Sequence, residues 1–175
     1  VLDALHLRVE QRMFGYTTHQ ATAHYNEAIV DWFLRRQAWT IDPSHLVYCP
    51  GTVQALNTAV KAFTEPGDGI IIQRPVYSPF TAVIERNGRS VINNELVNNS
   101  GFYTIDFEDL ETKAENPRTK MMFLCSPHNP VGRIWNPQEL KRIVDICIGH
   151  DVLLISDEIH GDLIRCNETF YPIAN

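Results

Sequence analysis

The feature of the sequence that most restricts its fold is the alternation of short apolar runs with helical patterns. Runs of this length, rich in leucine and β-branched residues, are typical of strands buried on both faces. Because helical patterns lie between them, the sequence predicts an α/β fold, a mostly parallel sheet with helices on both faces. The predicted strands are residues 46–49, 70–72, 89–93, 120–125 and the run that begins at Val152.

Four residues that could contact a ligand follow separate predicted strands. They are Gly51, Tyr77, Asn129 and Asp157. The carboxyl ends of parallel strands meet at one edge of a sheet, and ligands of open α/β folds bind there. We therefore expect these four residues to share one ligand site, where Asp157 could meet a positive group of the ligand.

Each of these residues also has an ordinary structural alternative. The turn at Gly51 leads into a helix whose free N–H groups and dipole suit a phosphate, or the glycine serves only the turn. Tyr77 could lie on a flat ligand or be a simple loop residue. Prolines on both sides of Asn129 hold its amide in one direction, although a turn asparagine can bond its own backbone. Asp157 could merely cap the following turn.

The charge of the sequence narrows the class of partner. The formal net charge is -6, and the lysines and arginines are scattered along the chain. This pattern argues against nucleic acid and anionic membrane surfaces. No apolar run approaches the length needed to cross a bilayer. We therefore expect a small-molecule ligand, no nucleic-acid or membrane partner, and a cytoplasmic location.

The cysteine pattern predicts reduced thiols. Cys49, Cys125, Cys147 and Cys166 form no Cys-x-x-Cys pair, and they lie in or beside apolar runs. Such cysteines are typically buried and structural.

Five stretches together resemble the pyridoxal-phosphate enzymes of the aspartate aminotransferase fold, fold type I. They are residues 50–56, 63–68, 74–80, 126–133 and 156–160. The most specific motifs are Ser-Pro-His-Asn-Pro-Val-Gly-Arg and Ser-Asp-Glu-Ile-His. Within this class I/II aminotransferase family, the sequence is most similar to the cystathionine β-lyase branch of C–S lyases. The resemblance implies an N-terminal helical segment, 1–45, and an incomplete pyridoxal-phosphate-binding large domain, 46–175.

The resemblance implies roles around the ring of pyridoxal 5'-phosphate. Asp157 would pair with the pyridine nitrogen and keep it protonated, so that the ring can absorb electrons. Asn129 would hydrogen-bond the phenolic oxygen, and Tyr77 would stack on the ring. His160 would back the cofactor face or steady Asp157.

The resemblance also implies how the phosphate is held. Gly51 opens the phosphate loop, and the backbone amides of Thr52 and Val53 would hold the phosphate. Tyr16, in a Gly-Tyr-Thr sequence, would reach the phosphate region of a neighbouring subunit. A homodimer is therefore implied.

One expected family residue is missing from the sequence. The enzymes need a lysine that forms a Schiff base with the cofactor and then moves the α-proton. All lysines here precede Asp157: Lys61, Lys113, Lys120 and Lys141. The resemblance places this lysine, and the arginine for the substrate carboxylate, beyond Asn175. We therefore expect a fragment with no catalytic residue of its own, inactive by itself.

The implied activity is that of a C–S β-lyase. Its substrate would be cystathionine or a similar cysteine thioether, and its products a thiol, ammonia and pyruvate. An aminotransferase is the alternative within the same fold, and a non-catalytic cofactor-binding or interaction protein is the alternative of another class. A metal hydrolase using His128, Asp157, Glu158 and His160 lacks a further ligand at a diagnostic spacing, so we expect no metal.

Overall fold

A computed structural model describes residues 1–12, 14–15 and 23–175, and its main feature is a parallel four-stranded sheet. The strand order is β2-β1-β5-β6, and every neighbouring pair is parallel. The strands are β1 (Gly69–Ile72), β2 (Ser90–Asn93), β5 (Thr119–Cys125) and β6 (Leu153–Asp157). A separate antiparallel hairpin consists of β3 (Val97–Asn99) and β4 (Phe102–Thr104). The predicted α/β class with a parallel sheet is confirmed.

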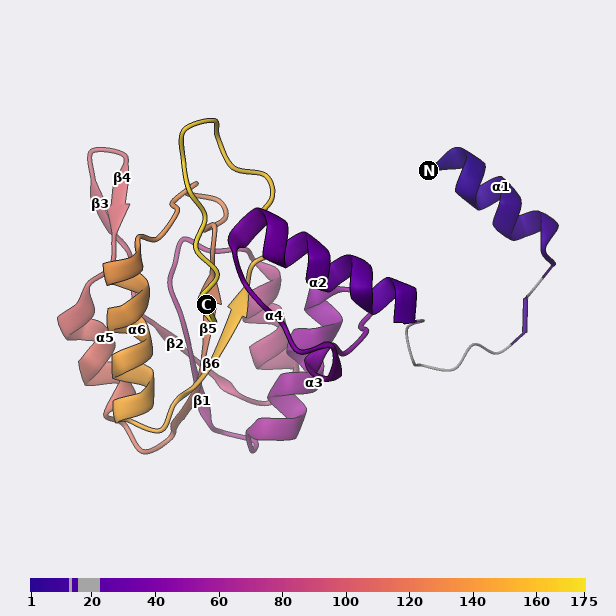
Figure 1. Cartoon of the computed structure of the whole chain (residues 1–175). Coiled ribbons are helices and arrows are strands. Elements are labelled where there is room, and N and C mark those ends of the chain that lie inside the picture. The colour runs from indigo at the N-terminus through magenta and orange to yellow at the C-terminus, as the bar shows by residue number, and fades with distance from the viewer. Residues whose placement is uncertain (13, 16–22) are drawn as a thin grey trace.

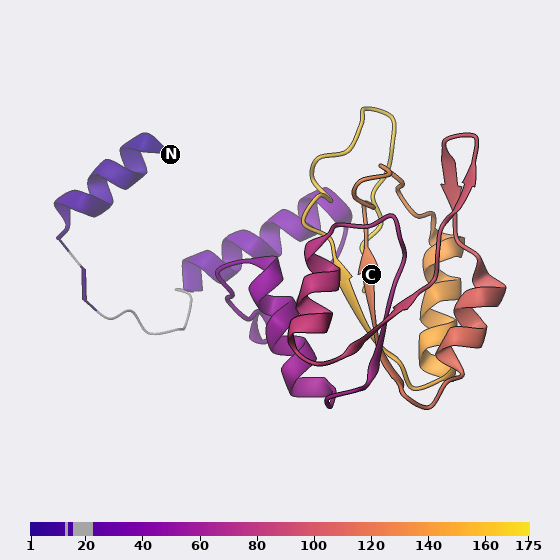
Figure 2. The same ribbon diagram turned by 180° about the vertical axis from the view of Figure 1, so that it is seen from behind.

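Helices cover both faces of the sheet (Figures 1 and 2). They are α3 (Thr52–Phe63), α4 (Pro79–Arg86), α5 (Phe107–Ala114) and α6 (Pro137–Gly149). The first two pack on one face through an apolar cluster that includes Val60 and Phe80. The other two pack on the opposite face through a cluster that includes Trp135 and Ile143. We call these the α3 face and the α6 face.

Alternate residues of each strand point to opposite faces of this sheet. Ile70 and Ile72 belong to the cluster on the α3 face, whereas Ile71 belongs to the cluster on the α6 face. All three are fully buried. Burial on both faces is the reason that residues 70–72 of β1 are apolar throughout instead of alternating with polar residues.

The described residues before the segment 46–49 are mainly helical. They form α1 (Leu2–Glu10), α2 (Ala23–Gln37) and the short 3₁₀ helix η1 (Pro43–His45). Neither α1 nor α2 has a buried residue. The C-terminal segment lies beside α2 (Figure 1), where Trp32 Nε1 donates a hydrogen bond to Asp162 Oδ2 at 2.9 Å. Tyr16 lies outside the described residues, so its predicted role stays a prediction.

The prediction of a strand at residues 46–49 is wrong. This segment has no regular structure, and Val47 is 89% exposed. An apolar run becomes a strand only where a neighbouring strand pairs with its backbone, and no described strand does so here. Gly51 therefore follows an irregular segment, and three of the four chosen residues, not four, follow a strand.

The prediction of four buried cysteines is also partly wrong. Cys125 and Cys147 are buried, but Cys49 is half-buried and Cys166 is exposed. All four are free thiols. Cys166 follows the last strand in a segment with no regular structure, so no sheet or helix covers it. Among the helices of the described chain, none is long and apolar enough to span a bilayer.

Candidate functional site

The carboxyl ends of three strands meet at one edge of the sheet. β5 and β6 pair in a register that places Cys125 opposite Asp157, and Ser126 N donates to Asp157 O at 3.0 Å. β1 lies on the other side of β5, so the loop that carries Tyr77 leaves the same edge. The topology therefore brings the segments carrying Tyr77, Asn129 and Asp157 together at this edge, as expected for parallel strands.

Asp157 points to the α3 face of the sheet. Ile155, two residues earlier in β6, packs against the cluster on that face, and side chains two apart in a strand share a face. Asp157 is only 9% exposed, and its Oδ1 accepts a hydrogen bond from Ile159 N at 3.2 Å. No other group in the described residues bonds its carboxylate, so Oδ2 is available to a ligand.

Cys125 lies at the centre of this arrangement. Its Sγ accepts a hydrogen bond from Asn129 N at 3.3 Å, and it faces Asp157 across the strand pair. Burial, with a smaller contribution from the negative charge of Asp157, raises the pKa of the Cys125 thiol to about 11. The thiol is therefore protonated near neutral pH and serves as a packing and hydrogen-bonding group. Sequence reasoning missed this role because the register that pairs β5 with β6 is not encoded locally.

Asn129 is held by a tight loop. His128 N donates to Arg133 O, and Gly132 N donates to His128 O, both at 2.7 Å. The side-chain amide of Asn129 has no hydrogen-bond partner among the described residues. The bond from its own backbone to Cys125 places Asn129 beside the strand position opposite Asp157.

The first turn of α3 lies on the same face as Asp157. Val53 packs against the cluster that contains Cys125. Gly51 is the N-cap, and no side chain caps the helix. Ala55 N bonds Gly51 O, so the N–H groups of residues 52–54 have no acceptor in the described structure. Such a terminus suits an anion, and a Cβ added at Gly51 would meet no atom within 4 Å, which leaves room for one.

Tyr77 also lies on the α3 face. Its ring meets the ring of Phe80 edge-on, with centroids 6.2 Å apart and planes at 80°. Phe80 belongs to the apolar cluster of that face. Because Tyr77 is 38% exposed, part of its ring remains free to contact a ligand.

His160 lies just after β6. It lines a groove of about 790 Å³ together with Asn129 and Arg165. In the described structure its ring makes no hydrogen bond to Asp157. Oδ1 of Asp157 instead accepts the hydrogen bond from Ile159 N. A role of His160 beside the cofactor stays a prediction.

Glu158 was considered from the sequence only as a metal ligand, and the structure gives it a different role. Its Oε1 accepts hydrogen bonds from Ile173 N at 3.0 Å and from Ser156 Oγ at 2.9 Å. Burial raises the pKa of this carboxyl above its ordinary value. Glu158 therefore ties the last residues of the chain to the end of β6, beside Asp157. The only signal in the sequence was its place next to Asp157.

No lysine joins the group around Asp157. Lys61 lies in the last turn of α3, far from its N-terminus, and Lys120 lies at the start of β5. Lys113 and Lys141, on α5 and α6, pair with carboxylates four residues away.

The described residues contain no group of three or more histidine, cysteine, aspartate and glutamate side chains that could hold a metal ion.

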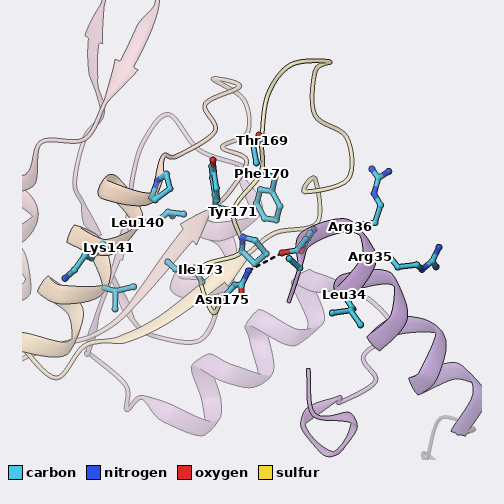
Figure 3. Close-up of a pocket in the computed structure, with 15 residues that line it drawn as sticks. Leu34, Arg35, Arg36, Leu140, Lys141, Thr169, Phe170, Tyr171, Ile173 and Asn175 are labelled. Carbon is cyan, nitrogen blue, oxygen red and sulfur yellow. Dashed lines mark hydrogen bonds between the residues drawn. The ribbon is translucent and has the colours of Figure 1, made fainter. Parts of the chain in front are cut away.

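A second cavity, of about 710 Å³, lies away from this site (Figure 3). It opens between the end of α2, the first half of α6 and the C-terminal segment, where Asn175 Nδ2 donates to Gln37 O at 3.1 Å. Its lining includes Leu34, Leu140 and Phe170 and none of the predicted site residues. The candidate site is therefore the sheet edge around Cys125.

Comparison with known proteins identifies relatives of this chain in a single family. The family model for class I and II aminotransferases matches residues 2–175. Cystathionine beta-lyase PatB of Bacillus subtilis is 42% identical over 175 residues, which are 100% of this chain and 45% of that protein. Protein MalY of Escherichia coli is 33% identical over 175 residues, which are again 100% of this chain and 45% of that protein.

A solved structure agrees closely in fold. Cystalysin from Treponema denticola, which contains a pyridoxal 5'-phosphate cofactor, superposes with a TM-score of 0.94 at 39% identity. The match covers 98% of this chain and 43% of that chain. The chain thus spans less than half the length of these relatives.

Proposed function

Because the chain belongs to the class I and II aminotransferase family, we propose that it forms the cofactor-binding part of a pyridoxal-phosphate-dependent C–S β-lyase. The substrate would be cystathionine or a similar cysteine thioether. The enzyme would convert it, with one water molecule, to a thiol, ammonia and pyruvate. The observation that carries the proposal is the arrangement around Cys125, where Asp157, Asn129 and the free terminus of α3 share one region of the sheet. The identity to a cystathionine beta-lyase supports this substrate class.

The residues fit the chemical groups of the cofactor. The N-terminus of α3 offers three free N–H groups and open space for a phosphate. Asp157 offers a buried carboxylate oxygen for a protonated ring nitrogen, and Asn129 offers an unpaired amide for the phenolic oxygen. Tyr77 offers an aromatic surface for the ring. Together these groups match an aromatic ligand with one phosphate, one basic nitrogen and one phenolic oxygen.

Each residue would contribute to the reaction by binding or orientation. Bound pyridoxal phosphate supplies an electron sink that stabilises negative charge at the substrate α-carbon. Asp157, shielded from water, would hold the proton on the ring nitrogen, and Asn129 would fix the ring by donating Nδ2–H to its phenolic oxygen. The α3 terminus would anchor the phosphate, and Tyr77 would exclude water from one ring face. We propose that the lysine expected beyond Asn175 completes the site, so that this chain alone does not turn over.

We also propose that the protein acts as a homodimer. On α1, Leu2, Leu5 and Val9 are 72%, 56% and 61% exposed. An apolar row of this kind is typical of a helix that packs against another surface. The proposal fits the implied contact of Tyr16 with a neighbouring subunit.

The activity is tested on the full-length protein that contains this chain. Incubation with cystathionine should release pyruvate, measured with lactate dehydrogenase, and Asp157→Ala should abolish it. Asp151→Asn is a matched control, because it removes an exposed carboxylate at the other end of β6 and asparagine tolerates the positive φ of 55°. Failure to form pyruvate from any cysteine thioether would overturn the lyase proposal.

An aminotransferase is the second candidate, because the matching family model describes aminotransferases. A β-lyase would expel the thiol from the substrate β-carbon once the α-proton has left, whereas an aminotransferase would keep the β-substituent and pass the amino group to a keto acid. Exchange of amino groups between an amino acid and a keto acid, without release of a thiol, would establish this alternative. Cofactor binding with neither activity would instead support a non-catalytic binding protein.

A further inference from the structure

Arg133 is a charged residue that the proposed chemistry does not use, and it closes the loop that carries Asn129. An antiparallel bridge joins His128 to Arg133, and His128 N donates to Arg133 O at 2.7 Å. Asn129 is the first residue inside this closed loop. The side chains of Asn129 and Arg133 line the same groove of about 790 Å³. The place of Asn129 therefore depends on how the loop is held at Arg133.

The guanidinium group of Arg133 contacts two aromatic rings. Its carbon lies 4.3 Å from the ring centroid of Phe102, in β4, and 4.8 Å from that of Trp135. Contacts of this kind are favourable within about 6 Å. Trp135 is fully buried, meets the ring of His128 edge-on at 5.5 Å and donates Nε1–H to Cys125 O at 3.0 Å. The two rings therefore connect Arg133 to the hairpin and to the end of β5.

The hydrogen bonds of the same guanidinium group reach β4 and α6. Arg133 Nη1 donates to Tyr103 O at 3.1 Å, and Nη2 donates to Glu139 Oε1 at 2.6 Å. Glu139 Oε2 accepts from Asn136 N at 2.8 Å, within the capping box of α6. The side chains of Arg133 and Glu139 are only 11% and 16% exposed, so salt and water screen this ion pair little. One side chain thus fixes the end of the loop to two other elements.

The support of Asn129 from the strand side is weaker. Its backbone N–H donates to Cys125 Sγ at 3.3 Å, and a thiol sulfur is a weak acceptor. A side chain that orients a ligand has to be held to within about 0.5 Å of the productive position. The contacts of Arg133 at the other end of the loop are the stronger constraint.

We propose that Arg133 is a positioning residue of the cofactor site, which holds loop 128–133 so that the Asn129 amide meets the phenolic oxygen of pyridoxal phosphate. The inference rests on the proposed function, in which Asn129 binds that oxygen. Arg133 is occupied by its own partners and acts through the loop backbone. Because its effect passes through Asn129, the effect should disappear when the Asn129 amide is absent.

The test uses two ligands and the cofactor-free form of the full-length protein that contains this chain. Pyridoxal phosphate has the phenolic oxygen and 3-deoxypyridoxal phosphate lacks it, so the ratio of their affinities isolates the contribution of that oxygen. In fluorescence titrations, we expect this ratio to fall by about tenfold in Asn129→Ala and by about fivefold in Arg133→Met. The double variant should give the same ratio as Asn129→Ala alone.

Arg142→Met is the matched control. The Arg142 guanidinium lies 4.3 Å from the ring centroid of Phe107, so the substitution also removes a contact between a cation and a ring. Arg142 lies on α6, and Phe107 is the first residue of α5. Neither belongs to the loop of Asn129, so Arg142→Met should keep the wild-type ratio.

The outcomes separate this inference from the proposed function. If Asn129→Ala lowers the ratio and folded Arg133→Met does not, Arg133 has no positioning role. If Arg133→Met lowers the ratio further in the absence of the Asn129 amide, its effect takes another route, and the inference is equally wrong. If Asn129→Ala itself leaves the ratio unchanged, the proposed role of Asn129 fails and the inference falls with it.

A second measurement needs neither a cofactor nor a substitution of Arg133. Phe102 is 59% exposed, so Phe102→Leu removes one ring contact of Arg133 at an exposed position, where folding tolerates substitution. In the cofactor-free protein we expect amide exchange of His128 and Gly132, whose N–H groups make the 2.7 Å bonds of the loop, to become about threefold faster. Exchange as slow as in the wild-type protein would overturn the claim that Arg133 holds the loop.

Discussion

Gly51→Ala separates a role of Gly51 in folding from a role in phosphate binding. Gly51 has φ 178° and ψ 154°, an extended conformation that alanine adopts without strain. An added Cβ would meet no protein atom within 4 Å. Replacing glycine stabilises the chain by about 0.4–1 kcal/mol through the unfolded state, whereas loss of the glycine N-cap costs a similar amount. We therefore expect a net change in unfolding free energy within about 0.5 kcal/mol.

Phosphate binding should respond differently to the same substitution. The new methyl group would enter the open space at the N-cap of α3, the helix end at which we place the phosphate. We expect affinity for pyridoxal phosphate to fall by about tenfold, equivalent to 1.4 kcal/mol. Affinity for pyridoxal, which has no phosphate, should change little.

The assay is a fluorescence titration of the wild-type protein and of Gly51→Ala, each with pyridoxal phosphate and with pyridoxal. Urea unfolding of both proteins is measured alongside. The ratio of the two affinities isolates the phosphate contribution and removes any general effect on the ring site. If Gly51→Ala kept the wild-type ratio while remaining folded, the phosphate would not lie at the α3 terminus. A loss of stability above about 2 kcal/mol would refute the structural reasoning about Gly51.

Three further predictions concern the elements that support the site, each measured by urea unfolding. Trp135→Phe removes the 3.0 Å bond from Nε1 to Cys125 O and should cost about 1–2 kcal/mol; an unchanged midpoint would contradict the importance of this bond. Asn136→Ala breaks the capping box with Glu139 at the start of α6 and should cost about 1 kcal/mol, whereas Gln138→Ala, in the same turn, should be nearly neutral. The pKa of His128 is lowered in the folded protein. Its contribution to the free energy of unfolding is therefore fully present above the unfolded pKa near 6.5. This contribution is lost as the pH falls through the folded pKa, by at most about 1.4 kcal/mol per pH unit. His128→Gln should flatten this dependence, and an equal slope in both proteins would disprove the assignment.

The two central strands could be predicted because they are buried on both faces. Residues 70–72 of β1 and 121–125 of β5 are continuous apolar runs, and the predicted bounds of both strands lie within one residue of the observed ones. The start of α6 was also predictable, since Asn136 and Pro137 have well-defined preferences at the cap and first helical position. Local sequence preference and burial agree in these elements.

Other features depend on contacts that the sequence does not encode locally. The run at residues 46–49 has the composition of a strand, but no described strand pairs with it. The β3–β4 hairpin is not among the predicted strands, because its exposed residues, among them Asn98 and Asn99, lack an apolar alternation. The central place of Cys125 follows from the register that pairs β5 with β6.

We propose that Asp157 meets the ring nitrogen of pyridoxal phosphate. The most direct measurement is the ¹⁵N NMR shift of ring-labelled pyridoxal phosphate bound to this protein. We expect a protonated ring nitrogen at neutral pH in the wild-type protein and loss of that proton in Asp157→Ala. An unprotonated nitrogen in the wild-type complex, or the same shift in both proteins, would contradict it.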